Sequence, residues 1–243
     1  RYTRLTGDLN ITKSITVKVT ANAKPVIEAS DIELEENGEL THNYSASDTE
    51  DGDFTDQVTI DTSNVDITKA GKYDCIYTVK DSYNQQTQKT VKVYVLSTGP
   101  SVRYTTQVQD YGWLRTSENG DMSGTSGESK RLEAIKVQLV HMDYEGSIEY
   151  RTHIQDIGWE EEWKKDNELS GTVHQSKRLE SIEMRLTGEV AEHYDLYYRV
   201  HAQDYGWMSW AKNGEISGTS RLSKRLEGIE IVLVPKGQEP PVV

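Results

Sequence analysis

Apolar and polar residues alternate along much of the chain, which is the period of a β-strand with one buried face. The alternation is clearest in three pairs of stretches. The first member of each pair is YTTQVQ from Tyr104, YRTHIQ from Tyr150 or YRVHAQ from Tyr198. The second member is SKRLEAIKVQL from Ser129, SKRLESIEMRL from Ser176 or SKRLEGIEIVL from Ser223. In the last of these, the apolar residues after Leu226 fall at Ile229, Ile231 and Leu233. We therefore predict an all-β protein.

The paired stretches belong to a repeat that occurs three times. The pentapeptide QDYGW at 109–113 recurs at 203–207, with QDIGW at 155–159 between them, so the tryptophans stand 46 and 48 residues apart. Each copy has Ser-Gly-Thr ten or eleven residues after its tryptophan, and the middle copy has one extra residue before Ser170. So regular an interval indicates a repeated structural unit of the propeller, prism or trefoil kind.

Three copies, each with about three strands, predict a pseudo-threefold β unit. A β-prism is favoured over a β-trefoil, because the strand after SKRLE runs by a short turn into the next Tyr strand. We assign this unit to 98–235, with repeats at 102–140, 148–187 and 196–234. Residues 236–243 are predicted to be a linker or tail toward further modules.

The region before the repeats has short alternating strands with turn residues between them. Asn-Gly at Asn37, Asp-Gly at Asp51 and Ala-Gly at Ala70 separate these strands, and a predicted hairpin closes the region. This pattern predicts a β-sandwich at 23–97. Residues 1–22 contain ITVKVT, much as 89–95 reads KTVKVYV, so we interpret them as the end of a preceding sandwich of the same kind.

Two family resemblances rest on these residues. SASDTEDGDFTDQVTI, followed by VDITKAGKYDCIYTVKDSYNQQTQKTVKVYV, resembles the immunoglobulin-like domains of Gram-positive surface proteins, with Asp81-Ser-Tyr-Asn84 in place of the usual D-x-x-GN. The region 102–234 resembles three ChW repeats, the clostridial hydrophobic repeat with a tryptophan, in its Q-x-x-G-W, S-G-T and K-R-L-E-x-I elements. The resemblances imply an extracellular or cell-surface protein of a clostridium-like bacterium, in a family whose ligands are mostly unassigned.

Charge and motif content narrow the function. The chain has 27 basic and 40 acidic residues and a net charge of -13, so it should repel nucleic acid and anionic membranes. No apolar run approaches the eighteen or so residues that would span a bilayer, and membrane insertion is not expected. HExxH, G-x-S-x-G and Gly-rich phosphate loops are missing from the sequence. Three near-identical copies present the same groups three times, whereas catalysis needs unlike groups at one site. We predict that the chain is not an enzyme.

The pentapeptide carries the first set of candidate binding residues. An indole face beside an amide and a carboxylate can stack on a sugar ring while the oxygens accept hydrogen bonds from its hydroxyls. The alternative, which we favour, is that each tryptophan closes the core of a lobe while the Gln and Asp order a tight turn. The residues concerned are Gln109, Asp110, Trp113, Gln155, Asp156, Trp159, Gln203, Asp204 and Trp207.

A second tryptophan occurs in two copies only. Trp163 and Trp210 stand where the first copy has Thr116. Because loss of an aromatic residue is easier to accept at a surface site than in a core, we predict that these two lie on exposed loops and are the better ligand candidates.

Charged residues supply two further hypotheses. The Lys-Arg pairs beginning at Lys130, Lys177 and Lys224 could capture a sialic or uronic acid, although we favour an ion pair within the strand, such as Arg225 with Glu227. In the sandwich, carboxylates near two predicted loops suit calcium, and a solvated acidic loop is the favoured alternative. These carboxylates are Asp48, Glu50, Asp51, Asp53 and Asp81. No other cofactor is predicted.

Two functions remain open. The first is a non-catalytic glycan-binding or adhesion module, held out from the cell by immunoglobulin-like spacers, with two or three similar shallow sites. The second is a protein-interaction or assembly module that holds a surface complex or a host protein, with purely structural tryptophans.

Overall fold

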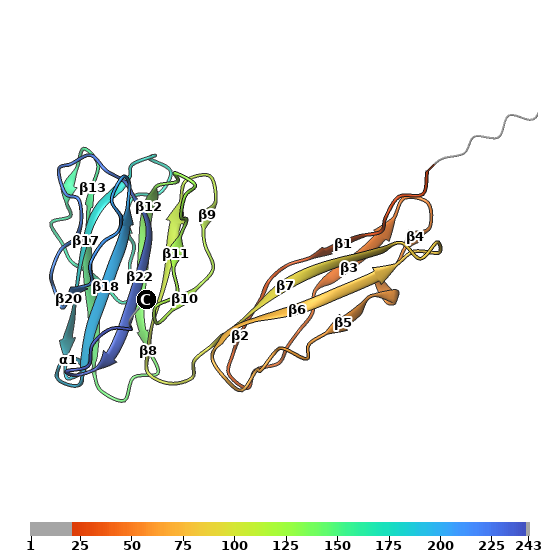
Figure 1. The fold of residues 1–243 in the computed structure, drawn as a ribbon. Helices are drawn as coiled ribbons and strands as arrows, with labels where there is room; N and C mark the ends of the chain where they lie inside the picture. Colours follow the sequence, from red (N-terminus) through yellow and green to blue (C-terminus); the bar gives the residue numbers. More distant parts are fainter. Residues whose placement is uncertain (1–20, 242–243) are drawn as a thin grey trace, which may run out of the picture. The chain divides into compact units, whose positions relative to one another are not determined.

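The computed structural model describes residues 21–241, so residues 1–22, which we interpreted as the end of a preceding sandwich, lie almost entirely outside the described residues. As predicted, the regular secondary structure of the described residues is almost wholly β-strand (Figure 1). It divides into two compact units. The second unit contains Leu34–Gly38, Ile67–Gly71 and the residues from Val95 onward, and the first contains the rest.

The first unit has the two sheets expected of an immunoglobulin-like sandwich. One sheet has the order β1-β3-β4, and the other has the order β2-β7-β6-β5. Alternate residues along the two longest strands are buried, for example Tyr77 and Val79 on β6 and Val91 and Val93 on β7. The strands are β1 (Val26–Ala29), β2 (Ile32–Glu35), β3 (Tyr44–Asp48), β4 (Gly52–Asp53), β5 (Thr59–Asp61), β6 (Gly71–Lys80) and β7 (Gln86–Leu96), with a 3-10 turn, η1 (Thr55–Gln57), before β5.

The second unit is built from three long antiparallel hairpins, one for each repeat (Figure 1). They are β8 (Ser101–Val108) with β12 (Leu132–Val140), β13 (Gly146–Ile154) with β17 (Leu179–Gly188), and β18 (Tyr194–Ala202) with β22 (Leu226–Pro235). A single helical turn, α1 (Val190–His193), connects β17 to β18.

Short strands in the hairpin loops complete each sheet. The Gly-Trp strands β9 (Gly112–Trp113), β14 (Gly158–Trp159) and β19 (Gly206–Trp207) pair with the first strand of their own repeat. So do β10 (Ser117–Glu118), β15 (Lys164–Lys165) and β20 (Ala211–Lys212).

The Ser-Gly strands are exchanged between repeats. Strand β16 (Ser170–Gly171) of the second repeat pairs with β12 of the first, and β21 (Ser217–Gly218) of the third pairs with β17 of the second. Strand β11 (Ser123–Gly124) of the first repeat pairs with β22 of the third, which closes the cycle. The predicted pseudo-threefold unit is therefore confirmed, and its three sheets are compatible with a prism.

The exchanged strand needs its glycine. Gly124 has φ +129°, and a Cβ there would lie 2.4 Å from the carbonyl oxygen of Glu227 in the neighbouring repeat. Gly171 and Gly218 have φ +106° and +124°, and a Cβ would meet the carbonyl oxygens of Glu133 and Glu180 at 2.5 and 2.6 Å. Only glycine combines this φ with so close an approach of two backbones.

Three buried tyrosines occupy the centre of the second unit. Tyr104, Tyr150 and Tyr198 are at most 2% exposed. Each phenol oxygen accepts a backbone N–H from the previous repeat in the cycle, those of Ile231, Val137 and Met184, at 3.1, 3.0 and 3.0 Å. Each also donates to a backbone carbonyl of its own repeat, those of Asp121, Glu168 and Glu215. The tyrosines therefore join the three lobes to one another.

Candidate functional site

Each QDxGW pentapeptide forms the same tight turn. In the first copy, the N–H of Tyr111 donates to the carbonyl of Val108 at 3.1 Å, and Asp110 has φ +67°. The equivalent aspartates, Asp156 and Asp204, have φ +61° and +67°. Asp is among the few residues besides Gly that enter this left-handed region readily. The Gln and Asp therefore order a turn, as the alternative interpretation predicted.

A lysine from the SKRLE segment reaches each of these aspartates. The Lys130 Nζ lies 2.6 Å from Asp110 Oδ2, and this hydrogen bond lowers the pKa of the Asp110 carboxyl below its usual value. The equivalent pairs are Lys177 with Asp156 at 3.2 Å and Lys224 with Asp204 at 2.5 Å. The sequence reasoning did not connect these two motifs, although both occur in every copy.

The arginine of SKRLE pairs with the glutamate two residues later. The Arg225 to Glu227 distance is 2.6 Å, and the distances for Arg178 with Glu180 and Arg131 with Glu133 are both 2.7 Å. The structural interpretation of the Lys-Arg pairs is therefore confirmed: each lysine and each arginine already has a carboxylate partner.

A β-bulge changes the direction of each of these glutamates, which are only 4 to 6% exposed. Leu132 pairs with Val108 and Ala134 pairs with Gln107, so Glu133 is the extra residue of the strand. Glu180 and Glu227 are bulged in the same way. Bulges re-aim side chains in this manner. Sequence reasoning missed the bulge, but its signal was present: Leu226 and Ile229 are three residues apart, where an unbroken strand would keep a spacing of two.

The residue opposite the bulge differs between repeats. In the second and third repeats it is a histidine: His153 Nδ1 lies 3.0 Å from Glu180 Oε2, and His201 Nδ1 lies 3.1 Å from Glu227 Oε2. The two imidazoles also meet the edges of Trp159 and Trp207, with ring centroids 5.6 and 5.5 Å apart. In the first repeat the residue is Gln107, which pairs in register with Trp113.

The tryptophans of the pentapeptide lie outside the core. Trp113 is 40% exposed, and Trp159 and Trp207 are half-buried on the outer face of their sheets. The prediction that they close the lobes is wrong, because the tyrosines of the preceding strand fill that place. The three indoles keep exposed surface beside the Gln and Asp of the same turn, and a cation lies over part of each ring: Lys136 at 5.4 Å from the centre of Trp113, Arg151 at 5.5 Å from that of Trp159 and Arg199 at 4.9 Å from that of Trp207.

The second tryptophans are also half-buried, so the prediction of exposed loops is wrong for them. The Arg151 guanidinium lies 4.9 Å from the centre of the Trp163 ring, and that of Arg185 lies 4.1 Å away. Arg199 lies 4.7 Å from the centre of Trp210, which also packs against Tyr197 and Val232. These contacts cover ring surface that a ligand would otherwise stack on.

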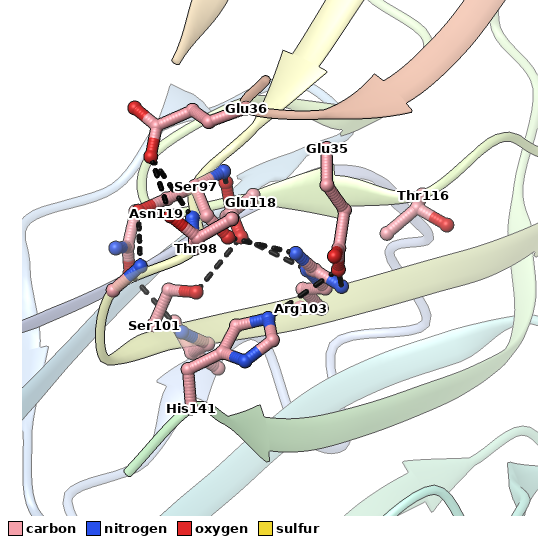
Figure 2. Close-up of polar contacts among 12 residues, drawn as sticks. Glu35, Glu36, Ser97, Thr98, Ser101, Arg103, Thr116, Glu118, Asn119 and His141 are labelled. Carbon is pink, nitrogen blue, oxygen red and sulfur yellow. Dashed lines mark hydrogen bonds and ion pairs between the residues drawn. The ribbon is translucent and has the colours of Figure 1, made fainter. Parts of the chain in front are cut away.

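The first repeat has no such stack at the same place. In the first repeat, the carboxylate of Glu118, two residues after Thr116, accepts hydrogen bonds from Ser101 Oγ at 2.8 Å and Arg103 Nε at 2.9 Å (Figure 2). A polar cluster within the repeat unit therefore takes the place of the Trp-Arg stack.

A cavity of about 370 Å³ opens beside the first pentapeptide. Gln107, Gln109, Asp110, Arg131 and Glu133 of the first repeat line it, and His174 and Ser176 of the second repeat complete it. The exchange of β16 into the sheet of the first repeat brings these two residues there. The cavity therefore belongs to two repeats at once.

Apolar side chains project from the same turns. The variable residue of each pentapeptide is exposed, with Tyr111 at 56%, Ile157 at 54% and Tyr205 at 56%. Each turn follows the end of the first strand of its hairpin, and the hairpins are related by the pseudo-threefold arrangement. The three turns therefore lie together at the end of the unit opposite α1 (Figure 1). We call this end, made by 109–113, 155–159, 203–207 and the SKRLE loops, the turn end.

The carboxylates predicted for calcium are used within their own loops. Asp48 Oδ1 accepts the N–H groups of Glu50 and Asp51 at 2.8 and 3.1 Å, and Asp53 Oδ1 accepts that of Thr55 at 2.8 Å. Asp81 Oδ1 accepts the N–H of Gln85 at 2.7 Å. Within residues 21–241, no three His, Cys, Asp or Glu side chains gather as a group that could hold a metal ion. The alternative of a solvated acidic loop does not fit Asp48 and Asp81, which are buried, and Asp48 Oδ2 has no hydrogen-bond partner among the described residues.

Family models match both parts of the chain. A model described as "Clostridial hydrophobic W" (ChW) matches 107–141, 153–188 and 201–235, and one described as "Bacterial surface protein, Ig-like domain" matches 28–95. Both resemblances found in the sequence are confirmed. Over the part of the chain described here, no helix has the length and apolar character needed to span a bilayer.

Comparison with individual proteins gives more limited likenesses. The pesticidal crystal protein Cry22Aa of Bacillus thuringiensis is 40% identical over 88 residues, which is 33% of this chain and 12% of that protein. The chain thus spans about an eighth of the length of this relative. The CBM51-2 and INT domains of Clostridium perfringens ZmpB, solved in complex with GlcNAc, align with a TM-score of 0.31 at 12% identity, covering 89% of this chain and 45% of theirs. The lipoprotein BT2262 of Bacteroides thetaiotaomicron aligns with a TM-score of 0.30 at 14% identity, covering 85% and 98%. At these TM-scores the structural likeness carries no functional inference.

Proposed function

Because the chain carries three ChW repeats behind a bacterial surface immunoglobulin-like domain, we propose that it is a non-catalytic binding module of a bacterial surface and that its repeats bind glycan. The observation that carries the proposal is the threefold recurrence of one surface arrangement. Each turn places a partly exposed indole beside an amide, a carboxylate and their cationic partners.

This arrangement suits sugars for physical reasons. An indole face covers the apolar face of a pyranose, and the neighbouring amide and carboxylate accept hydrogen bonds from its hydroxyls. Each contact contributes only a few kcal/mol, so one site binds weakly. Three similar sites at one end of a rigid unit raise the overall avidity on a repetitive polysaccharide without any new contact. The immunoglobulin-like domain would act as a spacer.

The proposal is tested on a glycan array with the full chain and a variant that carries Trp113→Ala, Trp159→Ala and Trp207→Ala together. We expect retention of glycan by the full chain and loss of that retention in the triple variant. The control is Tyr83→Ala, which removes an aromatic side chain that is 70% exposed in the first unit and should leave retention unchanged. Glycan retention by the folded triple variant at the level of the full chain would refute the proposal.

A protein partner is the second candidate, and the exposed Tyr111, Ile157 and Tyr205 are the observation that favours it. Aromatic and aliphatic side chains gathered at one end are typical of protein-binding surfaces. Replacing these three by Ser leaves the indoles in place. If the serine variant loses a partner captured from surface extracts while neither it nor the full chain retains glycan, the turn end is a protein-binding surface instead.

A further inference from the structure

We infer that the three turn-end sites are unequal and that the cavity of the first repeat binds a neutral sugar. The hydroxyl groups of this sugar would donate hydrogen bonds to Gln107 and Glu133. The inference rests on the proposed function and names its ligand class and its specific subsite.

Gln107 has an unmet hydrogen-bonding need. Its side chain lines the cavity and is only 7% exposed, and its Oε1 has no hydrogen-bond partner among the described residues. A buried acceptor without a donor costs about 1 to 3 kcal/mol, and native structures contain few of them. A hydroxyl placed in the cavity would supply the missing donor.

The other two repeats place an imidazole where the first has the Gln107 amide, and each imidazole Nδ1 lies near a carboxylate although neither contact has hydrogen-bond geometry. At the same register position, His153 and His201 place Nδ1 at 3.0 and 3.1 Å from the bulged glutamates. An imidazole N–H can donate to a carboxylate. In the first repeat, Gln107 Oε1 and the Glu133 carboxylate are both acceptors and cannot satisfy one another. The first repeat therefore lacks the imidazole–carboxylate contact of the other two and instead places two acceptors at a cavity, where a donor from outside can reach them.

The cationic side chains at the cavity already have carboxylate or amide partners, so an acidic ligand fits the cavity less well than a neutral one. Arg131 is bound to Glu133 at 2.7 Å and to Gln109 at 2.9 Å, and Lys130 is bound to Asp110 at 2.6 Å. A uronic or sialic acid would have to displace these carboxylates. An ammonium group would meet Arg131 at close range, so a hydroxyl is the favoured donor.

The neighbouring repeat adds to the difference between the sites. His174 and Ser176 complete the cavity of the first repeat. Residues Arg221 and Gly127 occupy the position of His174 in the other two loops, with the same left-handed backbone at φ +67° and +77° against +61°. Cyclic exchange of the Ser-Gly strands therefore gives each site a different neighbouring side chain on a common backbone.

The test is an NMR titration of the full, 15N-labelled chain that follows the side-chain amide signals of Gln107. The probes are the methyl α-glycosides of glucose, galactose and mannose, with glucosamine and glucuronate as the charged comparisons. We expect at least one neutral glycoside to shift the Gln107 amide signals in a saturable way, and glucuronate to leave them in place. A larger shift with glucosamine would mean that an ammonium group is the donor and would overturn the assignment of a neutral ligand.

Two exchanged variants make the test specific. Gln107→His gives the first repeat the side chain of the others, and we expect the affinity for the neutral glycoside to fall at least about tenfold. His153→Gln gives the second repeat the glutamine of the first, and we expect the neutral glycoside to cause new saturable shifts of amide signals around residue 153. The thermal transitions of both variants report whether they fold.

The outcomes separate the two proposals. If glycosides shift only signals near Trp159 and Trp207, or if folded Gln107→His binds as well as the full chain, the subsite is refuted while glycan binding stands. If no simple glycoside shifts Gln107 and the glycan array still shows retention through the indoles, the subsite is refuted alone. If neither the NMR titration nor the glycan array shows glycan binding, the subsite and the proposed glycan-binding function are both refuted.

Discussion

Tyr198→Phe is expected to loosen the whole repeat unit, although it removes a single oxygen atom. The phenol of Tyr198 is fully buried, accepts the N–H of Met184 from the second repeat at 3.0 Å and donates to the carbonyl of Glu215. On β17, the exchanged strand β21 pairs with Ser181 and Ile182. The phenol of Tyr198 therefore provides a hydrogen-bond acceptor for the β17 backbone at Met184, beyond the end of β21.

The magnitude follows from the groups that would lose their partners. Phenylalanine keeps the ring and its packing, so the transfer term is small. The N–H of Met184 would lie in a dry interior without an acceptor, and each such orphaned group costs about 1 to 3 kcal/mol. We therefore expect a loss of about 1 to 3 kcal/mol in the free energy of unfolding, with the lower end corresponding to relaxation around the missing oxygen.

Calorimetry or denaturant unfolding of the full chain is the assay. We expect two transitions, one for each unit, and a fall of roughly 3 to 10 °C in the midpoint of the repeat unit alone. Tyr111→Phe is the matched control, because it removes the same oxygen from a ring that is 56% exposed and should change the free energy of unfolding by less than about 0.5 kcal/mol. A Tyr198→Phe midpoint within 1 °C of the original would refute the argument that the phenols join the repeats.

Three further predictions concern pH and calcium. Burial opposes ionisation of Asp195, but hydrogen bonds from the Gly237 N–H, Lys236, Lys212 and Asn213 outweigh it and hold its pKa well below the usual range. Its stabilisation should be complete above about pH 4, the pKa of an unfolded aspartate, and should be lost as pH falls below that value, so Asp195→Asn should flatten the acid limb of a stability–pH curve. Burial raises the pKa of Tyr198 to about 12, against about 10 in an unfolded chain, so stability should fall between these values as the unfolded state releases its proton, and less steeply in Tyr198→Phe. Added calcium or chelator should leave the midpoint of the first unit unchanged, and a rise with calcium would restore the predicted ion site.

The fold was readable from the sequence because its signals are local and repeated. Alternation of apolar residues predicts the long strands, and three copies of one pattern predict the threefold unit. The exchange of β11, β16 and β21 was not predictable in the same way. Each Ser-Gly-Thr segment contains a strand of only two residues, which is too short for a pattern of apolar residues to identify its partner strand. The sequence therefore does not indicate that Gly124 lies against Glu227 of another repeat.

The candidate site was harder to read, because burial depends on which face a residue takes. Tryptophan after glycine in every copy fits a core, yet Trp113 lies on the outer face opposite Gln107. The irregular spacing of apolar residues in the SKRLE strand was less conspicuous than the repeated tryptophan, but it was more informative about the site. A three-residue interval between Leu226 and Ile229 breaks the strand period, and a one-residue insertion moves the intervening glutamate to the other face.

The differences among the repeats carry functional information that a consensus would hide. Where the second repeat has Arg151, Trp163 and Glu183, the first has Thr105, Thr116 and Lys136. The third repeat keeps the set as Arg199, Trp210 and Glu230. The three positions change together because they form one stack.

Each member of the stack depends on the next. The arginine covers the second indole, and the glutamate neutralises the arginine, with Arg199 and Glu230 joined at 2.7 Å. Loss of the indole alone would leave the guanidinium and the carboxylate as a solvent-exposed ion pair on the sheet surface, and such a pair contributes little to the free energy of unfolding. The first repeat replaces the complete stack, and Lys136 lies 5.4 Å from the centre of Trp113, much as Arg151 and Arg199 lie 5.5 and 4.9 Å from the centres of Trp159 and Trp207. The repeat that lacks the stack also carries Gln107 and the cavity of about 370 Å³ at its turn end, so two departures from threefold symmetry occur in the same repeat.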